Sequence, residues 1–140
     1  MRTTHGRIAA IIADHRDAAR RARRHGDWGR CWQLLEDAHV LSQPWALLHV
    51  RVHASMLAAG WEARDAVEVR GQILRLLAGG PASAIGRYPV GNTGRARVPA
   101  TRPMPIRRDL AEILSEVGRC RGALDQQRVQ THAGEEPAER

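Results

Sequence analysis

Residues 28–60 read WGRCWQLLEDAHVLSQPWALLHVRVHASMLAAG, and this stretch decides the fold. In its first half, residues 28–41, apolar side chains recur every three or four positions, as on one face of an amphipathic helix. Its second half, residues 45–59, is apolar almost all round, which is typical of a buried central helix. Because only Ser42-Gln43-Pro44 separates the two halves, the sequence predicts an antiparallel hairpin of two helices.

The same periodicity extends the bundle on both sides of the hairpin. It predicts helices over residues 7–24 and 62–77, and a final helix from Asp109. Gly60 is expected to end the third helix, and Gly79-Gly80-Pro81 is expected to end the fourth. The fourth helix is expected to turn four apolar residues to the core: Ala66, Val69, Ile73 and Leu76.

The composition favours one helical domain. The chain has 140 residues, which is enough to bury one core without disulfides. Phe is absent and aromatic residues make up only 4% of the chain, so the core must rest on aliphatic residues and alanine, which suits packed helices. We therefore predict an all-α fold: a single-domain antiparallel bundle of four to five helices over residues 1–125, followed by a polar tail over residues 126–140.

A long Pro/Gly/Arg-rich loop is expected before the last helix. Residues 81–108 hold five of the seven prolines, and their six arginines are accompanied by no acidic residue. Loops of this length in a compact domain are often functional. This basic loop would attract an anionic small molecule or a protein partner. Nucleic acid is disfavoured as a partner, because no aromatic residues alternate with the arginines to stack on bases.

The cysteines and the N-terminal segment bear on the compartment. Cys31 and Cys120 are isolated, which argues against a disulfide scaffold and against a cysteine zinc site. The apolar run over residues 8–13 is too short to cross a membrane. We expect a cytoplasmic protein with no membrane partner.

Four side chains of the ligand type lie on the predicted hairpin. Glu36 and His39 are three positions apart and His49 and His53 are four apart, so each pair shares one helix face. A buried imidazole without a partner costs about 1–3 kcal/mol, and a metal ion would satisfy one nitrogen of each ring. We therefore predict a metal site formed by Glu36, His39, His49 and His53. Histidines that are simply hydrogen-bonded to a carboxylate or to a backbone carbonyl are the structural alternative.

Two further segments are expected to serve this site. Glu68 and Gln72, four apart on the fourth helix, are candidates for an extra ligand or for hydrogen bonds to the imidazole N–H groups. Asn92 and Thr93 lie in a Gly-Asn-Thr-Gly turn that would fold over the site. Since the donors are nitrogen and oxygen, the cofactor is a divalent transition metal, with zinc, iron, manganese, nickel and copper all admissible.

The same residues carry a family resemblance. Residues 32–43, residues 49–53 and the stretch Tyr88-Pro-Val-Gly-Asn-Thr-Gly94 with Met104-Pro-Ile106 resemble a family of short bacterial proteins of unknown function. The pattern combines Leu-Glu-x-Ala-His-x-Leu, spaced histidines and Pro-Val-Gly-Asn-Thr-Gly. The resemblance implies a shared set of site residues and names no reaction: Glu36, His39, His49, His53, Asn92 and Thr93.

A second stretch leads to the alternative function. Residues 26–38 are similar to the opening of a tetratricopeptide repeat, although only about one repeat is present and such stacks usually need three. The leading hypothesis is a small intracellular metal-binding protein, either a metalloenzyme or a metal-handling protein. The alternatives are a helical interaction module and, less favoured, an arginine-driven nucleic-acid binder. The sequence leaves open whether the protein is an enzyme.

Overall fold

The computed structural model describes residues 4–84 and 88–118, and this part of the chain is all-α, as predicted. No strand occurs within these two ranges. The helices, in order, are α1 (Thr4–Arg24), α2 (Trp28–Ser42), α3 (Ala46–Glu62), α4 (Ala66–Ala84) and a final helix over residues 108–118. The predicted polar tail, residues 126–140, and Cys120 lie outside the described residues.

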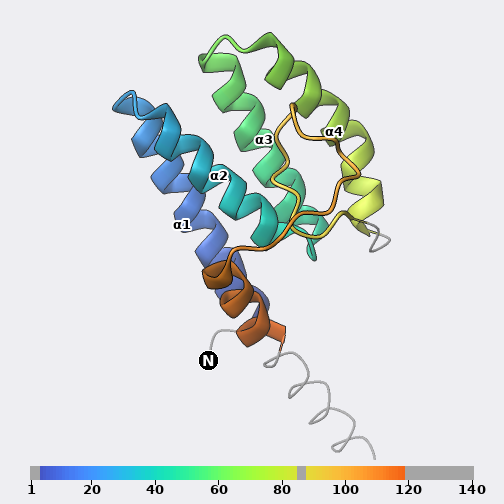
Figure 1. Cartoon of the computed structure of the whole chain (residues 1–140). Coiled ribbons are helices and arrows are strands. Elements are labelled where there is room, and N and C mark those ends of the chain that lie inside the picture. Colours follow the sequence, from blue (N-terminus) through green and yellow to red (C-terminus); the bar gives the residue numbers. More distant parts are fainter. Residues whose placement is uncertain (1–3, 85–87, 119–140) are drawn as a thin grey trace, which may run out of the picture.

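The four long helices form two antiparallel hairpins that meet along α2 and α3 (Figure 1). α1 packs against α2, and α3 packs against α4. Residues 88–107 carry no helix or strand; they cross in front of α3 and α4 and then lead to the final helix beside the start of α1. The ion pair of Arg7 with Glu116, at 3.1 Å, joins α1 to that final helix.

An aliphatic core fills the space between the helices, as the absence of Phe requires. Burying each Leu or Ile side chain stabilises the fold by roughly 1.5–3 kcal/mol. The stripes of α1 and α2 supply much of this core, and α3 supplies its centre. The largest fully buried apolar side chains are Ile8, Ile12, Leu35, Leu41, Val52 and Met56.

Gly60 does not end α3, which continues to Glu62. A Cβ atom at Gly60 would lie 3.2 Å from the Cβ and Cγ of Glu68, so this glycine lets α3 and α4 approach each other closely. The turn is made instead around Arg64, whose φ is +54°. The glycine is thus explained by helix packing rather than by the end of a helix.

α4 also differs from its predicted bounds. It continues to Ala84, past Gly79-Gly80-Pro81, although glycine and proline lower helix propensity. Its buried face is polar: Glu68 and Gln72 are fully buried, whereas Ile73 is 44% exposed. The expected apolar inner face of this helix was therefore wrong at Ala66 and Ile73, which are exposed, whereas Val69 and Leu76 are half-buried.

None of the helices in the described ranges combines the length and the apolar character that a membrane crossing requires.

The start of α4 yields a test of the fold. Asp65 accepts a hydrogen bond from the backbone N–H of Glu68 at 3.1 Å and pairs with Arg97 at 2.7 Å. Asp65→Ala removes the N-terminal cap and should lower the free energy of unfolding by about 1 kcal/mol, measured by urea denaturation. Asp65→Asn keeps a capping oxygen and should retain most of that stability. Equal losses in the two variants would show that the charge, and not the cap, is responsible.

Candidate metal centre

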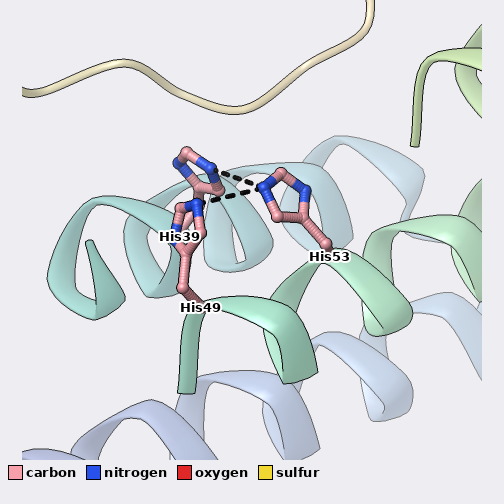
Figure 2. A group of neighbouring side chains, drawn as sticks. All are labelled: His39, His49 and His53. Atoms are coloured by element: carbon pink, nitrogen blue, oxygen red, sulfur yellow. Dashed lines mark hydrogen bonds between the residues drawn. The ribbon is translucent and has the colours of Figure 1, made fainter. Parts of the chain in front are cut away.

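Three histidines meet in the interior, between α2 and α3 (Figure 2). His39 belongs to the last turn of α2, and His49 and His53 lie one turn apart on α3. Their exposed fractions are 3%, 5% and 2%. The ring centroids lie 4.5, 4.6 and 4.8 Å apart, which is close to an equilateral triangle. The sequence spacing and the short α2–α3 connection therefore bring these three predicted ligands together.

The Nε2 atoms point inward toward one another. Nε2 of His53 lies 3.2 Å from Nε2 of His39 and 3.2 Å from Nε2 of His49. One ligand atom from each of the three rings can be chosen so that all lie within 4.8 Å of one another. The rings thus share a small, buried volume lined by nitrogen.

Two of the rings donate their Nδ1–H to carbonyl-type oxygens. Nδ1 of His39 lies 2.8 Å from the backbone oxygen of Asn92. Nδ1 of His53 lies 2.7 Å from Oε1 of Gln72. The Gln72 amide is oriented by its own Nε2, which donates to Glu68 Oε1 at 2.7 Å and to the backbone oxygen of Gly94 at 2.9 Å. Since an oxygen of this kind can only accept, the proton of each neutral ring sits on Nδ1.

The third ring, that of His49, also donates its Nδ1–H to an oxygen, here the hydroxyl oxygen of Ser42. The Ser42 hydroxyl donates to the backbone oxygen of His39 at 2.9 Å. Its oxygen lies 3.3 Å from Nδ1 of His49 and is left to accept from that ring. Each Nδ1 is therefore assigned a proton by its partner, and each Nε2 carries a lone pair.

The rings are neutral in this environment. Burial lowers the pKa of His39 well below its ordinary value, with the charges of His49 and His53 adding to the effect. Burial, followed by the charge of His53, lowers the pKa of His49 to about 3. Burial also lowers the pKa of His53, although the hydrogen bond to Gln72 acts in the opposite direction. Three lone pairs then face one another with no proton between them.

Glu36, the fourth predicted ligand, is not brought to the imidazoles. Its Oε1 accepts from Nη1 of Arg95 at 3.2 Å, and its side chain is 30% exposed. The Arg95 guanidinium lies over the ring of Trp32, 3.8 Å from its centroid. The group of possible ligands found in the described residues contains the three histidines and not Glu36.

Glu68 and Gln72 stand behind the histidines rather than among the Nε2 atoms. Gln72 links the ring of His53 to Glu68, as the predicted hydrogen bond to an imidazole N–H required. Glu68 is fully buried, and its charge is met by Nε of Arg95 at 3.1 Å and by the backbone N–H of Ala96 at 3.1 Å. The charge of this carboxylate is therefore balanced within the protein, and through Gln72 it supports the ring of His53.

The Gly-Asn-Thr-Gly turn lies against the ring of His39. Asn92 is 2% exposed, and its side chain holds the loop: Nδ2 donates to the backbone oxygens of Pro99 and Arg102, and Oδ1 accepts from Gly94 N–H. The Oγ1 atom of Thr93 is buried and has no hydrogen-bond partner among the described residues. The backbone of this turn therefore covers the His39 ring.

Gly94 allows the turn to approach the His39 ring closely. Its φ is +78°, and a Cβ atom at this position would lie 2.4 Å from Cδ2 and 2.6 Å from Nε2 of His39. Such distances are too short for a real Cβ atom, so only glycine fits at this position of the turn.

Three residues of the site were missed from the sequence. Ser42 and Gln43 were interpreted as a helix break, yet Ser42 holds His49, and Gln43 holds the loop through Pro89 O at 2.8 Å and Gly91 N at 3.0 Å. Arg95 was counted within the basic loop, and it bridges Glu36 and Glu68. These residues could have been found from the sequence, because each is a hydrogen-bonding residue close in sequence to a histidine or to the turn.

Comparison with known proteins places the chain in a family. A family model described as "Protein of unknown function (DUF3703)" matches residues 6–114, a segment that contains the three histidines and the turn. This agrees with the expected resemblance to a family of unknown function. Neither the curated proteins nor the solved structures gave a match. Because the matched segment covers well over half of the chain, the protein belongs to the DUF3703 family.

Proposed function

We propose that this protein binds one divalent transition-metal ion through the Nε2 atoms of His39, His49 and His53. The observation that carries the proposal is the convergence of three buried lone pairs, with each Nδ1 already committed to an oxygen. A buried acceptor left without a partner costs about 1–3 kcal/mol. One cation at the centre would satisfy all three nitrogens at once.

The spacing of the nitrogens supports an ion of ordinary size. Around tetrahedral zinc, with Zn–N distances of about 2.0–2.1 Å, two ligand nitrogens lie about 3.3–3.4 Å apart. Two of the Nε2 pairs here are 3.2 Å apart. A bound ion would draw the remaining pair to the same spacing. Imidazole donors suit zinc, copper(II), nickel and iron better than manganese, which prefers oxygen.

The hydrogen-bond partners of the three rings also support metal binding. Metal-bound histidines usually donate their second N–H to a fixed acceptor, which sets the tautomer and the ring orientation. Here that acceptor is a backbone carbonyl for His39, an amide oxygen for His53 and a hydroxyl for His49. All three acceptors are neutral, so the charge of the ion would remain largely uncompensated.

The donor set leaves room for a further ligand. No carboxylate or thiolate of the described residues joins the three histidines. Three protein ligands with an open fourth position are typical of zinc sites that bind water or substrate. An anionic fourth ligand, such as hydroxide or a carboxylate, would complete the charge balance. We therefore propose a metal-handling protein or a metalloenzyme in which the open position carries the chemistry.

Metal content tests the proposal directly. Protein purified without a histidine tag, treated with chelator and dialysed against zinc, should hold about one zinc ion per chain by elemental analysis. His53→Leu should weaken zinc binding more than about 100-fold, because even the loss of an outer hydrogen-bond partner costs about 10–100-fold. His25→Leu, at an exposed position outside the group, is the matched control and should bind zinc normally. Wild-type protein that takes up none of zinc, copper, nickel, cobalt and iron(II) would refute the proposal.

A pair of glycines tests the loop's contact with His39. Gly94→Ala forces a Cβ atom against the His39 ring, so zinc affinity should fall about 10–100-fold, as when other outer contacts are lost. Gly26 has a similar φ of +75°, but a Cβ atom there meets nothing within 4 Å. Gly26→Ala should therefore cost only the backbone strain, roughly 1–2 kcal/mol of stability, and leave zinc affinity unchanged. Calorimetric titration with zinc measures both, and equal affinities in the two variants would contradict the assigned contact.

A further inference from the structure

A cavity of about 230 Å³ opens between α1, α2 and α3, and none of its lining residues belongs to the histidine centre. Arg16, Arg20 and Arg23 line one side; they follow each other at four- and three-residue steps and so share a face of α1. Ser55 of α3 completes the polar lining. A cavity lined by three arginines is suited to an anion.

The arginines are held in place by their own partners. Nε of Arg16 donates to the Ser55 hydroxyl at 2.8 Å, and that hydroxyl donates to the backbone oxygen of Arg51. Arg20 pairs with Asp17. Nε of Arg23 lies 2.8 Å from Oε2 of Glu62, but the contact does not meet hydrogen-bond geometry, and this buried N–H remains unsatisfied. Anchored guanidinium groups keep their remaining N–H donors at fixed positions, which lowers the entropy cost of binding a ligand.

The positive charge of this region is not balanced within the described residues. Arg20 and Arg23 each have a carboxylate partner, but no carboxylate of the described residues lies within ion-pair distance of Arg16. Burial lowers the pKa of Arg16, and the charges of Arg20 and Arg51 lower it further. A half-buried cation repelled by its neighbours gains most from an added anion.

We infer that this cavity binds a small phosphate monoester. The Arg16 guanidinium lines the cavity without a carboxylate partner, Arg20 and Arg23 add positive charge beside it, and the arginine fork fits phosphate oxygens through paired hydrogen bonds.

The rest of the lining limits the size and character of the ligand. Leu35, Cys31 and several alanines form an apolar wall for a short carbon skeleton. Burial raises the pKa of the Cys31 thiol, so this wall is uncharged. The volume lies below the about 300–1,000 Å³ of sites for drug-sized ligands, so the cavity is matched to a small ligand.

Titration calorimetry on the full chain, at fixed ionic strength, tests the inference with glycerol 3-phosphate and with inorganic phosphate as probes. We expect saturable binding of both, with glycerol 3-phosphate the tighter because it also contacts the apolar wall. Arg16→Gln should weaken binding at least about tenfold, since a hydrogen bond to a charged group is lost. Arg21→Gln removes the same charge from an exposed position outside the lining and is the matched control.

The outcomes separate this cavity from the histidine centre. Equal losses in Arg16→Gln and Arg21→Gln would show unspecific attraction and overturn the site. Equal affinity for the two probes would overturn the monoester as its ligand. Phosphate binding that survives in Arg16→Gln but disappears in His53→Leu would place the anion on the metal and overturn the cavity. Binding that survives in His53→Leu supports the cavity whether or not the metal proposal holds.

Discussion

The convergence of three imidazole nitrogens in a dry interior is the constraint on which the rest of the site depends. Each neutral ring has one donor and one acceptor, so fixing the donor on an outside oxygen leaves the acceptor facing the centre. Asn92, Gln72 and Ser42 do this for the three rings. The arrangement is unfavourable without a cation and favourable with one. This is a physical reason to regard the cluster as more than buried histidines.

The loop between α4 and the final helix is the second structural support. Its arginines act mainly on the protein itself: Arg95 pairs with Glu36 and Glu68, and Arg97 pairs with Asp65. Arg107 similarly binds Asp37 on α2 at 2.9 Å. These ion pairs fix the loop to the bundle and keep the Asn92–Gly94 turn in contact with His39. The concentration of positive charge that stands out in the sequence is therefore largely neutralised in the fold.

The central helix pair contributes to both proposed sites. α2 and α3 carry the histidines, whose neutral donors suit a cation, and they also carry Cys31, Leu35 and Ser55, which line the arginine-rich cavity. Different residues of the same two helices would thus favour a cation in one place and an anion in the other. α1 adds residues to the lining of the cavity, and α4 adds the Gln72 hydrogen bond to the histidines.

The sequence by itself determined the helices and the histidine pairing, because apolar periodicity and three- or four-residue spacing are local properties that survive in any helical fold. Because the connection between α2 and α3 is short, His39 at the end of α2 lies close to His49 at the start of α3. Only the tertiary structure decided the fate of Glu36, because its partner Arg95 lies 59 residues away along the chain. The same holds for the polar inner face of α4 and for the close approach at Gly60. Spacing along a helix fixes which side a residue occupies, whereas the path of a distant loop fixes what it meets there.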